Sequence, residues 1–513
     1  MPVPTPSSTD SPLTLDGQPL GLADVVSVAR GTRRVALGTG ARQRVQAARL
    51  VIDAHATDDD PHYGINTGFG SLSRKRIAPD QVREVQRNLI RSHAAGVGEP
   101  LAGEVVRAMM LILAASLSRG MSGVRIDVIE LLIGMLNMGV TPIVPSRGSV
   151  GASGDLAPLA HLALVLIGEG HAWHRDAITD GSAALRNAGL ASVTLEAKEG
   201  LALINGTHLM CAIAALALTD VDRLRDASIA SAAVAIDACR ATDAFLDDRL
   251  HTARNQRGQR EVAKRLRALL QGSTIITAHK DNDPRVQDPY CLRCTPQVLG
   301  AAFDAISQVC DIVEAELGAV TDNPLVFASE KSIVSGGNFH GMPLAIAMDT
   351  LKIALCHIAG IAERRINWLL TASDSENPVN VYLSPQPGLH SGLMIVQYTA
   401  AACCNELQAL SHPASVHNIP TSAGIEDYNS MGATAAHQAR AVVELCTNVI
   451  AAELLVMTEA MEYQRPLRSG EGVERVYAAV RKVVPKLTAD RPPAPDLAAI
   501  VALIRAGLPP LAV

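Results

Sequence analysis

The residues that could do chemistry begin with a cluster of small ones. Residues 148–161 read "GSVGASGDLAPLAH" and gather glycine, alanine and serine around Ser153, immediately before an apolar, helix-like run. Glycine-rich backbone adopts conformations that larger side chains forbid. Three interpretations follow from these residue types: a flexible turn, a serine nucleophile, or a backbone that itself reacts.

A serine hydrolase is the second of these interpretations. Its nucleophile elbow has the pattern G-x-S-x-G and follows a buried strand. Here Asp155 stands where the second glycine of the pattern belongs, and the preceding "TPIVPSRGS" is not the pattern of a buried strand. The sequence therefore disfavours an elbow at Ser153.

The reactive-backbone interpretation is favoured by a family resemblance. Residues 148–164, "GSVGASGDLAPLAHLAL", resemble the signature of the histidine and phenylalanine ammonia-lyases, and the resemblance covers nearly the whole chain. It implies that the Gly154 nitrogen attacks the Ala152 carbonyl carbon and that two waters leave. Ser153 then becomes the exocyclic methylene of 4-methylideneimidazole-5-one (MIO). The resemblance thus implies an electrophile formed from the chain itself, with no external cofactor.

An electrophile suits the removal of ammonia from an amino acid. The β-proton of the substrate is barely acidic, and its ammonium group is a poor partner for elimination. A general base contributes about 10²–10⁴-fold, whereas enzymes usually supply ~10⁶-fold or more. A group that captures the amine and makes it a better leaving group acts by covalent catalysis.

Other polar loops match further parts of this family's site. Tyr63 opens "YGINTGFG" and matches the catalytic base, although a tyrosine ordinarily titrates near pH 10 and needs help to lose its proton. His93 in "SHAAG" and Asn205 in "INGTH" match an active-site histidine and the asparagine beside the electrophile. Taken alone, such residues would more often be packing or capping groups. Further substrate-binding residues implied by the resemblance are Gln287, Tyr290, Arg293 and Phe339.

The choice of substrate follows from a few positions. The pair Ser92–His93, together with Met394 and Glu426, resembles the histidine-specific members of the family. A glutamate carboxylate can accept an imidazole N–H, whereas opposite a phenyl ring it would lose a partner at a cost of about 1–3 kcal/mol. The resemblance therefore implies non-oxidative deamination of L-histidine to trans-urocanate, with Glu426 among the catalytic residues.

Two departures leave alternatives open. Ile425 and Tyr428 flank Glu426 where histidine enzymes usually carry glutamine and histidine, and Gly341–Met342 stands in place of Ala–Glu. A tyrosine or other aromatic amino acid ammonia-lyase, or a 2,3-aminomutase with the same electrophile, is the alternative inside the family. Outside it stand the serine hydrolase and a non-catalytic helical scaffold.

Helices must position these loops. The chain is 48% apolar but only 3% aromatic, which predicts a mainly α protein built from alanine and leucine. Apolar residues at i, i+3, i+4 spacing predict long helices over 296–320, 341–370, 391–410 and 435–463, packed as a bundle. We expect a disordered tail at 1–12, a loop-rich domain with the MIO turn at 13–225 and the long-helix bundle at 226–513, the architecture that histidine ammonia-lyases share with fumarase.

Bulk properties limit the partners and the compartment. The formal net charge of -6 with no basic block argues against nucleic acid or an anionic membrane. Nine cysteines in no framework spacing indicate a reducing cytoplasm. The CxxC at Cys291 and Cys294 is followed by no second cysteine pair or histidine couple at zinc-finger distance, which disfavours a metal site there. The first residues show no signal-peptide pattern, and we expect no apolar run to reach the ~20 residues of a membrane span. The resemblance and the long apolar helices imply a homotetramer that takes a small amino acid and holds no metal.

Overall fold

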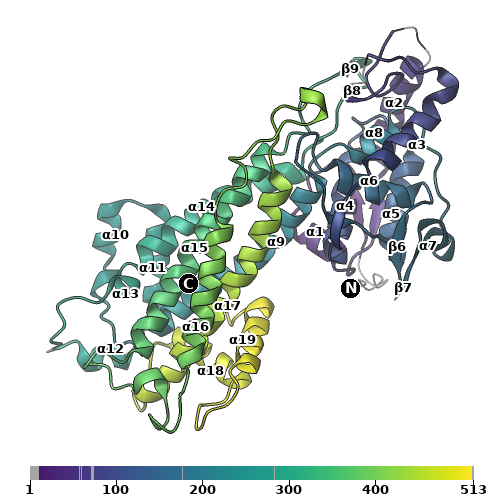
Figure 1. Cartoon of the computed structure of the whole chain (residues 1–513). Coiled ribbons are helices and arrows are strands. Elements are labelled where there is room, and N and C mark those ends of the chain that lie inside the picture. The colour runs from purple at the N-terminus through teal and green to yellow at the C-terminus, as the bar shows by residue number, and fades with distance from the viewer. Residues whose placement is uncertain are drawn as a thin grey trace. The chain divides into compact units, whose positions relative to one another are not determined.

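The computed structural model describes residues 11–510 except 57, 59, 71–73, 176 and 282 (Figure 1). These residues form helices α1 to α19 and four small sheets of two or three strands, so the expected mainly α class is confirmed. Most of the expected tail, residues 1–10, lies outside the described residues.

The chain divides into two compact units, and neither is continuous in sequence. The first comprises the described residues of Met1–Thr219, Cys310–Asp349 and Pro413–His437, and the second those of Asp220–Val309, Thr350–His412 and Gln438–Val513. The single domain boundary expected at residue 225 stays a prediction.

The first unit is built from helices α1 to α8 and from strands β1 to β9. Its helices are α1 (Leu22–Ala29), α2 (Thr39–Ala56), α3 (Val82–His93), α4 (Gly103–Ser118), α5 (Ile126–Met138), α6 (Leu156–Leu166), α7 (Gly181–Asn187) and α8 (Glu199–Ile204), with the 3-10 turns η2 (Pro79–Gln81) and η5 (Ser422–Gly424). Its strands pair as β1 (Leu13–Leu15) with β2 (Val35–Leu37) in parallel, and as antiparallel β3 (Val97–Pro100) with β5 (Pro145–Arg147), β4 (Thr141–Pro142) with β6 (His171–His174) and β7 (Ala177–Asp180), and β8 (Leu325–Phe327) with β9 (Ser332–Val334).

Helix α4 forms the centre of this unit because its sequence, "GEVVRAMMLILAASLS", is apolar on every face. Arg107 of α4 is fully buried, and its guanidinium donates to the carbonyls of Val28 (2.9 Å) and Leu136 (3.0 Å). These carbonyls lie in the last turns of α1 and α5, where a helix leaves its own acceptors unpaired. Burial lowers the pKa of Arg107 to about 10. The side chain thus joins helices α1, α4 and α5.

The second unit contains the long helices. Helices α9 (His208–Ala238), α14 (Thr295–Leu317), α15 (Met342–Leu370) and α17 (Gly432–Gln464) contribute residues to both units. The remaining elements are η3 (Ala244–Leu246), α10 (Asp248–Arg254), α11 (Arg257–Leu270), α12 (Thr274–His279), α13 (Tyr290–Arg293), η4 (Val381–Leu383), α16 (Met394–Leu410), α18 (Glu471–Val483) and α19 (Ala494–Ala506). The four long helices expected from periodicity are therefore present as α14 to α17.

These long helices gather in one bundle (Figure 1), and a buried ion pair joins three of them. Arg365 of α15 pairs with Glu453 of α17, and Ser231 of α9 donates to the same carboxylate at 2.6 Å. Both charged side chains are fully buried, so each needs the other to offset the loss of water.

By length and composition, α15 and α17 could each cross a membrane, which corrects the expectation that no apolar run is so long. In the structure, 61% and 78% of their most apolar windows are buried. Such burial is typical of core helices of a bundle, where apolar residues on several faces meet neighbouring helices.

Candidate active site

A cavity of about 480 Å³ in the first unit collects most of the residues that the sequence singled out. Its size is in the range of ligand sites, roughly 300–1,000 Å³. The expected residues that line it are Tyr63, His93, Ala152, Ser153, Asn205, Phe339 and Glu426.

The turn at Gly154 is held against the backbone of Gly206. The Gly206 N–H donates to the Ser153 carbonyl at 3.2 Å, and the Asp155 N–H donates to the Gly206 carbonyl at 2.8 Å. Gly154 has φ +77°, and a Cβ on it would lie 2.1 Å from the Gly206 oxygen. Only glycine fits this close approach.

Asp155 anchors the same turn, a role that sequence reasoning missed. Its fully buried carboxylate accepts hydrogen bonds from the N–H groups of Leu209 (2.9 Å) and Met210 (3.0 Å) and from the Ser149 hydroxyl (2.8 Å). Leu209 and Met210 lie in the first turn of α9, where backbone N–H groups lack helical partners. Burial raises the pKa of Asp155 to about 6, and these hydrogen bonds act in the opposite direction.

The tripeptide fits the cyclisation that the family resemblance implies. Within the described part of the chain, the Gly154 amide N–H donates to no acceptor. The nitrogen is therefore free to act as a nucleophile, although unpaired buried N–H groups are rare. Ala152 is buried and lines the cavity together with Ser153. The attacking group is free while the flanking backbone is fixed.

Tyr63 lies in the cavity as a phenol rather than a phenolate. Its oxygen accepts a hydrogen bond from the Gly70 N–H at 3.3 Å. Burial raises the pKa of Tyr63, and the charges of Glu426 and Asp322 raise it further, against the opposing effect of the Gly70 hydrogen bond. Groups within this chain therefore favour the protonated form.

His93 is the last residue of α3 and presents one ring nitrogen as an acceptor. Its Nδ1 donates to the Leu89 carbonyl at 2.9 Å, which leaves the lone pair on Nε2. Burial lowers the pKa of His93, so the ring is neutral at pH 7.

Asn205 follows α8 and offers an unused acceptor. Its Nδ2 donates to the Asn323 carbonyl at 3.0 Å, whereas its buried Oδ1 has no hydrogen-bond partner in the described structure. The Asn323 N–H donates to the Asp322 carboxylate at 2.6 Å, and that carboxylate pairs with buried Lys198, also at 2.6 Å. A buried polar atom without a partner is costly, so Asn205 Oδ1 is a candidate contact for a ligand. The Lys198–Asp322 pair that supports it was not foreseen.

Glu426 lies in the cavity wall with its Oε2 accepting from the Thr421 hydroxyl at 3.2 Å. The two residues flagged as departures, Ile425 and Tyr428, line the same cavity and are 68% and 67% exposed in the single chain. His340, whose Nε2 donates to the Tyr428 carbonyl at 2.9 Å, lines it as well. The departures are therefore part of the site.

The other departure, at Gly341, has a steric basis. A Cβ at this residue would lie 2.5 Å from Met210 Sδ and 2.8 Å from Ser430 Oγ. The alanine usual in histidine enzymes would need these neighbours to move.

Four expected residues lie elsewhere in this chain. They belong to the second unit and do not line the cavity: Gln287, Tyr290, Arg293 and Met394. Arg293 donates through Nε to the Asp288 carbonyl at 2.9 Å, and its guanidinium lies 4.6 Å from the centre of the Tyr290 ring. Their contact with substrate stays a prediction.

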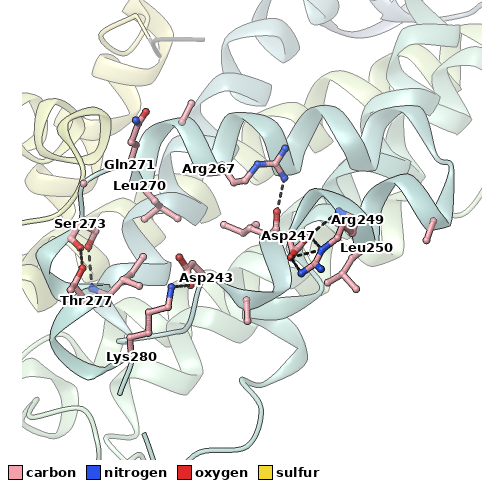
Figure 2. Close-up of a pocket in the computed structure, with 16 residues that line it drawn as sticks. Asp243, Asp247, Arg249, Leu250, Arg267, Leu270, Gln271, Ser273, Thr277 and Lys280 are labelled. Carbon is pink, nitrogen blue, oxygen red and sulfur yellow. Dashed lines mark hydrogen bonds and ion pairs between the residues drawn. The ribbon is translucent and has the colours of Figure 1, made fainter. Parts of the chain in front are cut away.

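A larger cavity, about 1190 Å³, opens in the second unit (Figure 2). None of the expected site residues lines it. Its charged side chains pair with each other or with neighbours: Arg249 with Asp247 (2.6 Å), Lys280 with Asp243 (3.5 Å) and Arg267 with Asp248 (2.9 Å). The smaller cavity is therefore the candidate active site.

Comparison with known proteins identifies the family of the chain. The model of the aromatic amino acid lyase family matches residues 20–482, and the chain belongs to this family. It is 47% identical over 503 residues to a histidine ammonia-lyase of Anaeromyxobacter sp. (strain K), with 96% of this chain and 99% of the relative covered. Among solved structures it resembles histidine ammonia-lyase from Trypanosoma cruzi (TM-score 0.88, 40% identity, 97% and 94% covered) and tyrosine aminomutase from Streptomyces globisporus (TM-score 0.90, 33% identity, 97% of each chain).

The expected family and the carbon–nitrogen lyase class are thereby confirmed. The serine hydrolase interpretation is wrong, because the family match covers the reactive turn and the loops around it. A non-catalytic scaffold with a relic site is tested by the activity measurement below.

Proposed function

We propose that this chain acts as a histidine ammonia-lyase that converts L-histidine to trans-urocanate and ammonia. The observation that carries the proposal is the Glu426 carboxylate in the wall of the cavity that also holds Ser153 and Tyr63. A carboxylate there accepts the imidazole N–H and would be unpartnered opposite a phenyl ring. The 47% identity to a histidine ammonia-lyase over nearly the full length supports the same substrate.

Ala152, Ser153 and Gly154 would hold the MIO group, formed without an external cofactor. Once formed, it supplies an electrophilic carbon that improves the substrate amine as a leaving group. The chain's contribution is the rigid turn: Gly206 fixes both flanking peptide groups, Asp155 ties the turn to α9, and the Gly154 N–H is left unpaired.

The surrounding side chains bind the substrate and move its proton. Glu426 accepts from the imidazole, Asn205 Oδ1 accepts from the substrate ammonium, and His93 Nε2 offers a second neutral acceptor. Phe339 lines the same cavity as Ser153. Tyr63 takes the β-proton. Because burial and the charges of Glu426 and Asp322 raise the pKa of Tyr63, a nearby positive charge would help to ionise it.

In this proposal the protein is a cytoplasmic homotetramer, and a neighbouring subunit supplies the positive charge near Tyr63. The cavity wall includes Ile425 and Tyr428, whose exposed apolar surface is typical of an interface. Arg293, which grips the substrate carboxylate in this proposal, would reach the cavity from a neighbouring subunit. Gln287, Tyr290 and Met394 would enter the same way.

The direct experiment is a substrate panel with the purified full-length protein. We expect L-histidine to give the ultraviolet absorbance of trans-urocanate and one ammonia per product. L-Phenylalanine, whose ring offers the Glu426 carboxylate no hydrogen-bond donor, should react about 5–150-fold more slowly, the equivalent of 1–3 kcal/mol. No urocanate from L-histidine, with turnover of another amino acid, would reject the proposal.

The second candidate is a tyrosine-directed enzyme, either a lyase or a 2,3-aminomutase. It is favoured by Ile425 and Tyr428, which line the cavity in place of the usual glutamine and histidine. An aminomutase would return the amine to the β-carbon, so the same panel distinguishes it by the appearance of a β-amino acid.

A further inference from the structure

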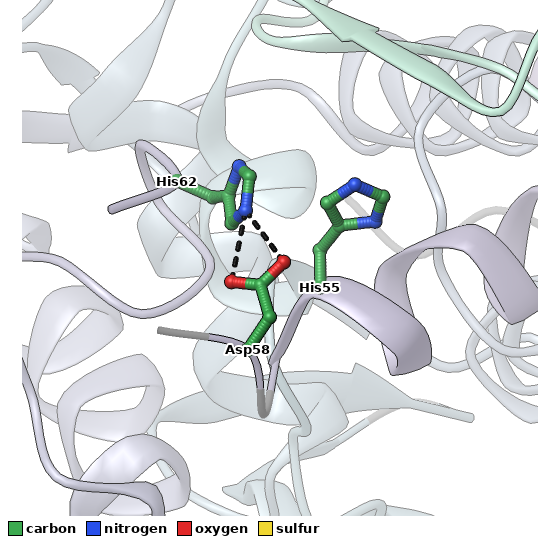
Figure 3. A group of neighbouring side chains, drawn as sticks. All are labelled: His55, Asp58 and His62. Atoms are coloured by element: carbon green, nitrogen blue, oxygen red, sulfur yellow. Dashed lines mark hydrogen bonds and ion pairs between the residues drawn. The ribbon is translucent and has the colours of Figure 1, made fainter. Parts of the chain in front are cut away.

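Three side chains of the kind that bind metals meet just ahead of Tyr63 (Figure 3). His55 lies near the end of α2, and Asp58 and His62 lie in the segment that follows. One ligand atom from each residue is within 4.8 Å of the other two, and all three residues are half-buried. The proposed function uses none of them.

The ligand atoms of His62 and Asp58 lie close enough to share one ion, and that of His55 lies within 4.8 Å of both. Zinc binds nitrogen and oxygen at about 2.0–2.2 Å, so two ligand atoms on a tetrahedral ion are about 3.3–3.5 Å apart. His62 Nε2 and Asp58 Oδ2 are 2.9 Å apart. The rings of His55 and His62 meet edge to face with centroids 4.6 Å apart and an interplanar angle of 86°. A small side-chain rotation of His55 would therefore complete a three-ligand site.

His55 is held in the tautomer that a metal requires. Its Nδ1 lies 2.9 Å from the Val51 carbonyl, which can only accept, so Nδ1 carries the proton and Nε2 the lone pair. A ring N–H bonded to a backbone carbonyl is the usual outer support of a metal-bound histidine.

The backbone around His62 is also fixed. Its N–H donates to Asn66 Oδ1 at 2.7 Å, and its carbonyl accepts from the Asn66 N–H at 3.2 Å. The backbone of His62 is therefore fixed before any ion binds, which lowers the cost of ordering this ligand.

A simple ion pair does not explain the whole cluster. It accounts for Asp58 and His62, just as His171 and Asp180 pair at 3.3 Å elsewhere in the chain. It gives no reason for the third group, His55, to bring a free lone pair to the same place. In the described part of the chain, this is the one group of three such residues with ligand atoms this close.

We propose that His55, Asp58 and His62 bind one divalent transition-metal ion of the zinc class, outside the catalytic cavity. Two imidazoles and one carboxylate suit Zn²⁺ and its neighbours Co²⁺ and Ni²⁺, and the fourth position is left for water. Because His62 directly precedes Tyr63, a bound ion would fasten the segment that carries the proposed base. This site departs from the expectation of no metal and does not depend on the proposed function.

The test is metal binding to the full-length protein after treatment with a chelator. Titration with Zn²⁺ against a chromophoric chelator should give one tight ion per chain. His55→Ala and His62→Ala should each weaken Zn²⁺ binding by at least tenfold, within or above the range of about 10–100-fold. His171→Ala, which removes a histidine from a pair without a third ligand, should bind Zn²⁺ as the unaltered protein does.

Co²⁺ identifies the ligands independently. Its visible spectrum should show four-coordinate nitrogen and oxygen ligation without the charge-transfer band of a thiolate, which separates this site from the nine cysteines. Circular dichroism in chelator should match for all variants. His55→Gln and His62→Gln, which keep polar side chains of similar reach, replace any alanine variant that fails to fold.

Three results would overturn the proposal. These are no stoichiometric Zn²⁺ binding, binding that His55 and His62 substitutions leave unchanged, or a thiolate spectrum with Co²⁺. Urocanate formation is measured separately in chelator, so a failure of the metal site and a failure of the proposed activity are told apart.

Discussion

The carbonyl oxygen of Gly206 occupies the place that a side chain on Gly154 would need: a Cβ there would lie 2.1 Å from that oxygen. The same carbonyl accepts the Asp155 N–H, so it cannot move without breaking the turn. Two glycines from loops some fifty residues apart in sequence therefore define the geometry of the reactive turn.

Gly154→Ala is expected to abolish ring formation and to lower kcat by at least about 10³-fold, because the collision displaces the attacking nitrogen. The measurement is urocanate formation together with the mass of the intact protein. Gly189→Ala is the matched control: Gly189 also has a positive φ (+71°) but no atom within 4 Å of an added Cβ. Full activity in Gly154→Ala would show that the turn tolerates a side chain and that our account of it is wrong.

Tyr63→Phe is expected to lower kcat by about 10²–10⁴-fold, the usual contribution of a general base, while leaving the loss of two waters at residues 152–154 unchanged. The two readouts separate proton removal from ring formation. If Tyr63→Phe kept most of its activity, another group would have to be the base.

The pH dependence of the unaltered enzyme follows from the same residue. Burial holds the pKa of Tyr63 above its ordinary value of 10.0 in the single chain, and the base works in its deprotonated form. The fraction of phenolate, and with it kcat/KM, should therefore rise with pH between about pH 7 and pH 9. Tyr63→Phe should lose this rise. A profile that is level or falls over this interval would contradict the assignment.

Glu426→Gln replaces a charged acceptor with a neutral one. We expect kcat/KM for L-histidine to fall by about 5–150-fold, equivalent to 1–3 kcal/mol, since hydrogen bonds to charged groups are the stronger ones. Asp427→Asn is the control, because Asp427 is the adjacent carboxylate in the same cavity wall. An equal effect of both substitutions would indicate a general loss of negative charge rather than a specific contact with the imidazole.

The ionisation of Asp155 should make the free energy of unfolding depend on pH. Its pKa is raised from 3.8 to about 6, so between these values the folded chain binds more protons than the unfolded chain. The free energy of unfolding should therefore fall as pH rises through this window, by up to about 3 kcal/mol from this residue, and be level above about pH 7.

Asp155→Asn keeps an acceptor for the Leu209 and Met210 N–H groups but cannot ionise. Denaturant unfolding of both proteins between about pH 4 and pH 7 should show the Asn variant gaining relative stability as pH rises. A difference in stability that does not change with pH would refute the buried, titrating Asp155.

The fold and much of the site could be predicted from sequence because their signals are local. Apolar spacing marked the long helices, and the tripeptide at 152–154 marked the turn. Tyr63, His93, Asn205, Phe339 and Glu426 were identified from short motifs, and all of them line one cavity.

The residues that were missed act through long-range contacts. Asp155 reaches the first turn of α9, and Lys198 pairs with Asp322 across 124 positions of sequence. No local pattern distinguishes these groups from ordinary surface charges. The glycine of "INGTH", Gly206, was the one available signal, because a glycine beside a polar loop often marks a close backbone approach. The segments of the two units also alternate along the sequence, and local sequence patterns do not reveal such an alternation.

The central claim is that Ala152, Ser153 and Gly154 condense into an electrophile, and the mass of the peptide that contains them tests it most directly. In folded, active protein, tandem mass spectrometry should find this peptide lighter than its sequence by two water molecules, with the deficit confined to these three residues. The same peptide from Ser153→Ala should lack the full deficit. A peptide of unaltered mass from active enzyme would contradict the account.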